Sequence, residues 1–153
     1  MARRIFISYQ HDDQMKAKGF NLLRWNKNVD IEFVGRHLLD PVDSTNEAYI
    51  SQKVREQIHG SSVTVVLIGE NTASSDWVKQ EVEWSLEKDK PNGVVGIRLQ
   101  NGVDIPEILS DCGAEIIDWS PHEFEQAIER AAQAAGRAKI AARGPGGGST
   151  CIR

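Results

Sequence analysis

The sequence has few cysteines and no long hydrophobic run. Only Cys112 and Cys151 occur among its 153 residues, so neither a disulfide framework nor a cysteine-based metal motif is present. The longest apolar stretch, residues 63–68, is far shorter than the roughly 20 residues that a membrane-spanning helix needs. A strand-like run starts at Ile5, which leaves no room for a secretion signal. We therefore expect a cytoplasmic protein without a membrane partner.

A basic excess is also missing. The formal net charge of −4 argues against a nucleic-acid-binding protein, which usually carries a positive surface. A hydrophobic fraction of 40% is enough for one core in a chain of this length. From Gly136 onward, however, every charged residue is basic and glycine is frequent. We expect one domain over residues 1–135 and a flexible, basic, Gly-rich tail over 136–153, either solvated or in contact with an acidic partner.

Motifs of several familiar classes of enzyme and switch are absent. There is no Gly-rich dinucleotide-binding fingerprint, no Walker loop and no serine in a nucleophile elbow. The four histidines show no metal-ligand spacing, so we expect no metal. A receiver-type site is incomplete because Ile68, Gly69 and Glu70 close the third predicted strand without an aspartate. Residues 10–13 are not the Ser/Thr-rich loop that a flavodoxin needs for phosphate.

The sequence does contain a regular alternation of strand-like and helix-like segments. Apolar or alternating runs predict strands over residues 5–9, 29–33, 63–68, 94–99 and 115–119. Helical spacing and capping residues predict helices over residues 12–26, 45–59, 76–88 and 105–112, and a last helix from Pro121 that Ser120 caps. Such alternation indicates a parallel sheet with helices on both faces. We predict a flavodoxin-like three-layer α/β/α fold with five parallel strands in the order 2-1-3-4-5.

A ligand site is expected where the strand order reverses, between the first and third strands. Residues 8–11 follow the first strand and residues 71–76 lead into the third predicted helix, so both segments border this edge. Trp77 and Glu81 share a face of that helix, about 100° from its apolar stripe. A carboxylate beside an indole suits a cationic, phosphate-bearing ligand, although the pattern alone favours a surface glutamate and a boundary tryptophan.

Two motifs resemble those of TIR and TIR-like domains. The run Arg4-Ile5-Phe6-Ile7-Ser8-Tyr9 is similar to their first-strand box, and Ser74-Ser75-Asp76-Trp77-Val78-Lys79-Gln80-Glu81-Val82 is similar to their third-helix motif. The resemblance covers most of the predicted domain and is greatest to the TIR proteins of bacterial Thoeris antiphage defence. It implies that Glu81 is the catalytic carboxylate of an NAD⁺ nucleosidase or ADP-ribosyl cyclase, with NAD⁺ as substrate and no further cofactor.

The resemblance also implies a set of substrate-binding residues: Phe6, Ser8, Tyr9, His11, Ser74, Asp76 and Trp77. The expected product is ADP-ribose or a cyclic ADP-ribose isomer, which would signal to a downstream effector. Self-association through TIR domains is expected as well. Two alternatives stay open at this point: a non-enzymatic TIR interaction module that uses the loop at residues 35–44, and an enzyme similar to nucleoside deoxyribosyltransferases.

Overall fold

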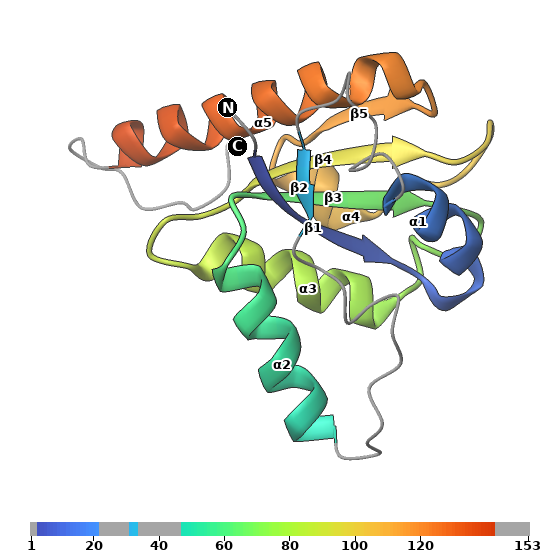
Figure 1. Ribbon diagram of the computed structural model, residues 1–153, viewed down its shortest axis with the longest axis horizontal. Helices are drawn as coiled ribbons and strands as arrows, with labels where there is room; N and C mark the ends of the chain where they lie inside the picture. The colour runs from blue at the N-terminus through green and yellow to red at the C-terminus, as the bar shows by residue number, and fades with distance from the viewer. Residues whose placement is uncertain (1–2, 22–30, 34–46, 143–153) are drawn as a thin grey trace.

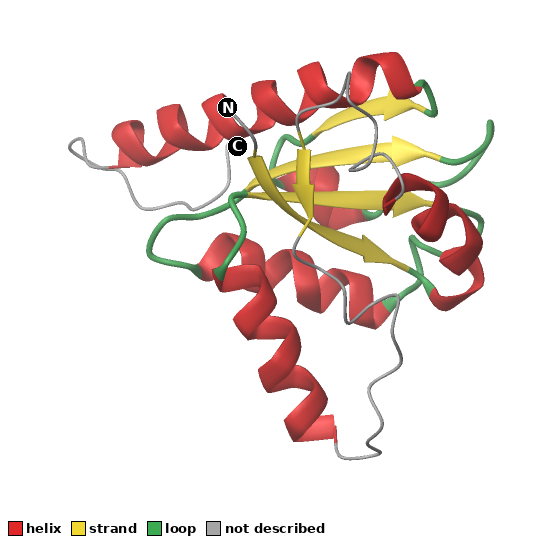
Figure 2. Cartoon of the chain, viewed as in Figure 1, coloured by secondary structure: helices red, strands yellow, loops and turns green. Residues whose placement is uncertain are grey.

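The computed structural model describes residues 3–21, 31–33 and 47–142, and all elements below lie in these ranges (Figure 1). The strands are β1 (Arg3–Tyr9), β2 (Ile31–Phe33), β3 (Val63–Ile68), β4 (Gly93–Arg98) and β5 (Glu115–Asp118). The helices are the short 3-10 helix η1 (His11–Asp13), α1 (Gln14–Asn21), α2 (Glu47–His59), α3 (Asp76–Glu87), α4 (Glu107–Asp111) and α5 (Pro121–Ala142). Helices and strands alternate along the described chain (Figure 2).

The strands pair in parallel and form one sheet. β1 lies beside β3, with Ile5 opposite Val63 and Tyr9 opposite Leu67. β3 pairs with β4, which pairs with β5, so the parallel α/β architecture predicted from the sequence is confirmed. β2 pairs with the outer side of β1, which gives the arrangement β2-β1-β3-β4-β5 across the sheet. The fifth strand of the predicted sheet is thus the three-residue β2, which pairs with β1 at one edge.

The two faces of the sheet are covered by different helices because successive side chains of a strand point to opposite faces. In Figure 1, α5 lies above the sheet, and α2 and α3 lie below it. The buried core under α1 and α5 contains Ile5, Ile7, Val63, Val65, Leu67, Val95, Ile97, Ala17, Phe124, Ala127 and Ile128. The buried core under α2, α3 and α4 contains Phe6, Val66, Ile68, Val94, Val54, Ile58, Val78, Val82, Leu86 and Leu109. By this alternation, Ser8 belongs to the face that α3 covers.

α5 approaches β4 closely at one glycine. A Cβ atom added at Gly93 would collide with the main-chain carbonyl of Ala131 in α5. The missing side chain therefore lets the helix backbone lie directly against the start of the strand.

The structure departs from the predicted elements mainly at their ends. The helix expected over residues 12–26 begins as η1 and becomes α-helical at Gln14, and residues 22–26 lie outside the described ranges. On α1, Met15 is 78% exposed, whereas Ala17 is fully buried. α5 continues to Ala142, past the expected domain boundary at residue 135. Residues 143–153 of the predicted tail and the loop at residues 35–44 are outside the described part of the chain.

Candidate active site

The candidate site is built around α3, whose start is fixed by a side-chain cap. The hydroxyl oxygen of Ser75 accepts a hydrogen bond from the main-chain N–H of Val78 at 3.2 Å, which satisfies a donor that the helix itself cannot. The stripe of Val78, Val82 and Leu86 packs into the core against β3 and β4. Glu81 lies on the neighbouring face of the helix, where it turns toward β1.

Glu81 is completely buried. Its exposed fraction is 0%, and the Ser8 hydroxyl of β1 donates a hydrogen bond to Glu81 Oε1 at 2.7 Å. The second carboxyl oxygen, Oε2, is buried too and has no hydrogen-bond partner among the described residues. A buried polar atom without a partner is unfavourable, because it has lost its hydrogen bonds to water without replacement. The sequence pattern alone favoured a surface glutamate, and the structure shows that this interpretation was wrong.

Burial also changes the protonation of this carboxyl. Loss of solvation raises the pKa of Glu81 to about 8, although the hydrogen bond from Ser8 acts to lower it. Tyr9 is the next residue of β1, and the pKa of its phenol is raised to about 12, first by burial and second by the nearby Glu81 carboxylate. With a pKa of about 8, the Glu81 carboxyl is mostly protonated at neutral pH. A pKa perturbed in this way is typical of functional sites.

Two tryptophans of α3 flank Glu81 along the helix. Trp77 lies one helical turn before Glu81 and is 37% exposed. Its ring meets the ring of Trp84 edge to face, with 5.8 Å between the centroids. Trp84 in turn packs against the cluster that contains the fully buried Phe6. Trp77 therefore offers an accessible indole supported by an aromatic neighbour, while Phe6 forms part of the core beneath it.

The loop between β3 and α3 is tied to η1. Asn71 Nδ2 donates to Asp12 Oδ2 at 3.0 Å, and Thr72 Oγ1 donates to Asp13 Oδ2 at 3.3 Å. Burial raises the pKa of Asp13, which the hydrogen bond from Thr72 partly counteracts. The segment after β3 that was predicted to border the site is therefore joined to Asp12 and Asp13, just past the predicted segment after β1.

A buried chain of polar groups holds α3 against β3. Ser85 Oγ donates to the main-chain carbonyl of Glu81 at 2.8 Å and lies 2.6 Å from the Thr64 hydroxyl. Asn92 Nδ2 donates to Thr64 Oγ1 at 3.1 Å and to Ser61 Oγ at 2.9 Å. This network fixes the backbone that carries Glu81. A hydroxyl inside the apolar β3 run is the sequence signal that could have revealed it.

Lys88 closes this network at the end of α3. Its ammonium donates to the main-chain carbonyls of Ile58 and Ser61, at 3.0 and 2.7 Å, and to Asn92 Oδ1. Partial burial lowers the pKa of Lys88. Because two acceptors lie at the end of α2 and the third follows α3, this lysine connects both helices, a role that sequence reasoning missed.

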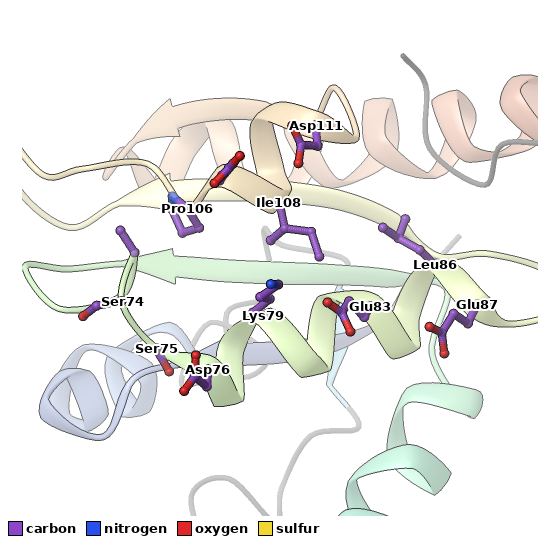
Figure 3. Close-up of a pocket in the computed structure, with 12 residues that line it drawn as sticks. Ser74, Ser75, Asp76, Lys79, Glu83, Leu86, Glu87, Pro106, Ile108 and Asp111 are labelled. Atoms are coloured by element: carbon purple, nitrogen blue, oxygen red, sulfur yellow. The ribbon is translucent and has the colours of Figure 1, made fainter.

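A cavity of about 550 Å³ lies elsewhere, between α3 and α4 (Figure 3). It is lined by Ala73, Ser74, Ser75, Asp76, Lys79, Glu83, Leu86, Glu87, Pro106, Glu107, Ile108 and Asp111. Its α3 residues lie roughly opposite Trp77 and Glu81 around the helix, given about 100° of rotation per residue. Ser74 and Asp76 therefore line this separate cavity.

The structure places the predicted site residues in different surroundings. Ser8 of β1 and Glu81 of α3 come together on the face of the sheet that α3 covers, with Trp77 one helical turn before Glu81. Tyr9 packs into the core on the opposite face. Phe6 is buried in the core on the Ser8 face, and Ser74 and Asp76 line the cavity between α3 and α4. The side chain of His11 lies outside the described part of the structure.

Neither a metal site nor a membrane-spanning helix is found in the described residues. They contain no group of three or more His, Cys, Asp and Glu side chains arranged to hold a metal ion. None of the helices in this part of the chain has both the length and the apolar character needed to cross a bilayer.

Comparison with known families and proteins gives two sequence matches. The family model described as "Thoeris protein ThsB, TIR-like domain" matches residues 6–104. A protein of Bacillus cereus (strain MSX-D12) named "Putative cyclic ADP-D-ribose synthase ThsB1" is 28% identical over 129 residues, which is 81% of this chain. The match spans 66% of that relative, just under two thirds of its length.

A solved structure supports the fold independently. The crystal structure of the TIR domain of the Toll-related receptor TRR-2 from Hydra magnipapillata has a TM-score of 0.52 to this chain. The likeness covers 87% of this chain and 97% of that domain, at 15% sequence identity. At this identity the likeness shows a shared fold and carries no conclusion about activity.

Proposed function

This chain belongs to the Thoeris ThsB family of TIR-like domains, and from that premise we propose that it cleaves NAD⁺ between ribose and nicotinamide, with Glu81 as the catalytic carboxylate. The observation that carries the proposal is the Glu81 side chain itself. It is fully buried one helical turn after an accessible indole, with one oxygen held by Ser8 and the other without a partner in the described part of the chain. The name of the Bacillus cereus relative, "Putative cyclic ADP-D-ribose synthase ThsB1", also supports chemistry on an ADP-ribose unit.

The chemistry needs one carboxylate. Cleavage breaks the bond between C1′ of the ribose and the pyridinium nitrogen, and the bonding electrons leave with nicotinamide, which becomes neutral. An ordinary glycosidase needs a second carboxyl group to protonate its leaving oxygen, but a neutral leaving group needs no acid. The ribose becomes an oxocarbenium-like cation. In our proposal the ionised Glu81 holds the ribose hydroxyls and stabilises that charge.

The fate of the cation decides the product. Attack by water forms a C1′–oxygen bond, releases a proton and gives ADP-ribose. Attack by a nitrogen of the same molecule's adenine forms a C1′–nitrogen bond and gives a cyclic ADP-ribose isomer. The relative's name as a cyclic ADP-D-ribose synthase favours the second route. Trp77 is the residue we assign to stacking a base, since it is the accessible ring at the rim.

The proposal includes several further expectations. His11 and Tyr9 line the substrate site, NAD⁺ is the substrate and no additional cofactor takes part. The domain associates with other copies, and its product acts on a downstream effector in antiphage defence. We also propose the flavodoxin-like strand order 2-1-3-4-5, with β2 as the edge strand. Residues 136–153 form a separate basic tail in the same proposal.

The test is to incubate the purified protein with NAD⁺ and to identify products by mass spectrometry. The assay is run with and without lysate of phage-infected cells, and with the protein forced to assemble on a scaffold. We expect nicotinamide release together with ADP-ribose or a cyclic isomer. The Glu81→Gln variant should be slower by on the order of 10²–10³, the usual effect of losing one electrostatic stabiliser.

Glu83→Gln is the matched control, because Glu83 is a carboxylate of the same helix that lines the cavity between α3 and α4 and does not lie beside Ser8. Release of nicotinamide under none of these conditions would contradict the proposal in favour of an interaction module. Base exchange on nucleosides that lack a pyrophosphate would point instead to a transferase. Because Glu81 must be ionised to act, kcat/KM should rise with pH through about 8.

A further inference from the structure

One polar side chain interrupts the apolar face of β1 that α3 covers. Ser8 follows Phe6 on this face, and Val66 is its register partner in β3. The Ser8 side chain has an exposed fraction of 0%, so solvent does not reach its hydroxyl. A hydroxyl buried there without a partner would destabilise the fold. The Glu81 carboxyl supplies this partner, 73 positions away in the chain.

The bond from Ser8 makes the two Glu81 oxygens unequal. An ionised carboxylate only accepts hydrogen bonds, so the Ser8 hydroxyl is the donor to Oε1, at 2.7 Å. A bond from a hydroxyl to a charged oxygen is short and strong, and it restricts rotation of the carboxyl group. Oε2 receives no such bond from the described residues. The geometry therefore leaves one oxygen anchored and the other buried without a hydrogen-bond partner among the described residues.

We propose that Ser8 is a positioning residue, which anchors Glu81 Oε1 so that Oε2 faces the ribose of the substrate. This inference rests on the proposed NAD⁺ cleavage and refines it. Ser8 then acts through Glu81 and does not itself touch the substrate, unlike the substrate-binding role that the family resemblance implies. A fixed carboxylate is already oriented toward the developing charge and needs no reorganisation during the reaction.

The charged groups around Glu81 leave Ser8 as its principal polar partner. On β1, Tyr9 is the ionisable neighbour, and its pKa of about 12 keeps the phenol neutral near pH 7. From α2, Arg55 lies over the Trp84 ring, 5.4 Å from its centroid. On α3, Lys88 bonds to oxygens at the far end of the helix. The β3 segment VTVVLI carries no ionisable side chain.

The first test titrates Glu81 directly, without substrate. The side-chain carboxyl carbon is followed by ¹³C NMR in the full-length protein, and its signal is assigned by its loss in Glu81→Gln. In Ser8→Ala the midpoint should move upward by about one to two pH units, because a hydrogen bond to the charged form is lost. Ser8→Thr keeps the hydroxyl and should titrate like the wild type.

Ser85→Ala is the matched structural control. It also removes a buried hydroxyl next to Glu81, but this hydroxyl donates to the main-chain carbonyl and not to the carboxyl group. It should lower the melting temperature and leave the carboxyl titration in place. If Ser8→Ala does not fold, Ser8→Cys replaces it, because a thiol is a much weaker donor of similar size.

The second test measures the reaction. In Ser8→Ala the acid limb of kcat/KM should move to higher pH by the same amount as the NMR midpoint, and kcat should fall about 10-fold or more while KM changes little. Ser8→Thr should restore both values. Suppose that the wild type cleaves NAD⁺ and that Glu81→Gln abolishes this activity. Equal titration curves for Ser8→Ala and the wild type would then overturn the inference about Ser8 and leave the proposed function in place. Suppose instead that the midpoint shifts in Ser8→Ala although the wild type cleaves no NAD⁺ under any condition. That outcome would overturn the proposed function, and with it the catalytic role of the hydrogen bond from Ser8.

Discussion

Replacing Glu81 by glutamine should make the protein more stable, by an amount that grows with pH. The pKa of Glu81 is about 8 in the folded protein, against 4.5 for a solvated glutamate. Between these values the folded state binds a proton that the unfolded chain has lost. The stability that this carboxyl contributes is therefore complete below about pH 4.5 and disappears as the pH rises through 8. Glutamine carries no charge and removes this dependence.

The size of the effect follows from the same two values. Each pH unit between 4.5 and 8 lowers the free energy of unfolding of the wild type by about 1.4 kcal/mol. From pH 4.5 to pH 7, the advantage of Glu81→Gln should thus grow on the order of 3 kcal/mol. In a domain of this size, that corresponds to a rise of roughly 6–12 °C in the melting temperature relative to the wild type.

The measurement is urea unfolding at several pH values between 4.5 and 8, followed by tryptophan fluorescence. The chain has four tryptophans, and Trp77 and Trp84 lie close to Glu81. Subtracting the wild-type curve from that of Glu81→Gln cancels all other titrating groups. Glu83→Gln, on the same helix but at the α3–α4 cavity, should give a much smaller and flatter difference.

A difference that stays constant across this range would refute the reasoning. It would mean that Glu81 folds with an ordinary carboxyl pKa, and hence that water or a hydrogen-bond donor reaches Oε2. The pH dependence expected for kcat/KM would then lose its basis as well. A difference that shrinks with rising pH would reverse the sign and require a cation next to the carboxylate.

Three other predictions concern other parts of the structure. Gly93→Ala should destabilise the protein by about 1–3 kcal/mol in urea unfolding, because the added Cβ would meet the Ala131 carbonyl. Gly19 lies on a helix with open space around it, so Gly19→Ala should be neutral or stabilise the protein by up to about 1 kcal/mol. Lys88→Met should lower the free energy of unfolding by about 2–3 kcal/mol, because three oxygens lose a charged donor, and an unchanged value would contradict the assigned role. NAD⁺ binding near pH 7 should release protons from Glu81. Calorimetry would detect this release as a binding enthalpy that varies with the ionisation enthalpy of the buffer. A binding enthalpy that is the same in all buffers would argue against ionisation of Glu81 on binding.

Much of the fold could be predicted because local sequence and global position agree. The β3 run of residues 63–68 is apolar throughout, as expected for a strand buried on both faces, and the structure has these same bounds. Ser75 and Pro121 mark helix starts by capping and by fixed backbone geometry. The ends of α1 were less predictable, because Gly19 and the polar residues around it give a weak pattern. Met15 shows this, since this large apolar side chain of α1 is exposed to solvent.

The location proposed for the site follows from the sequence, but the environment of its side chains does not. Parallel topology puts the ends of β1 and β3 at one edge, so the approximate location follows from strand order. The burial of Glu81 does not follow, because it depends on contact with Ser8 of a distant strand. The links from Lys88 to the end of α2 depend in the same way on tertiary packing. Periodicity along one helix holds no information about which strand that helix will cover.

The burial of Glu81 is most easily understood as a feature kept for chemistry. An apolar residue at this position would avoid the unfavourable desolvation of a carboxyl group, and the described structure offers Oε2 no compensating partner. Proteins tolerate such unfavourable groups at functional sites, where a ligand supplies the missing interaction. A substrate with a positively charged pyridinium ring and ribose hydroxyls would supply both a countercharge and hydrogen-bond donors. In our proposal, binding would then ionise the carboxyl group at the moment when its charge is needed, so the unfavourable burial of Glu81 and its catalytic role would have one physical origin.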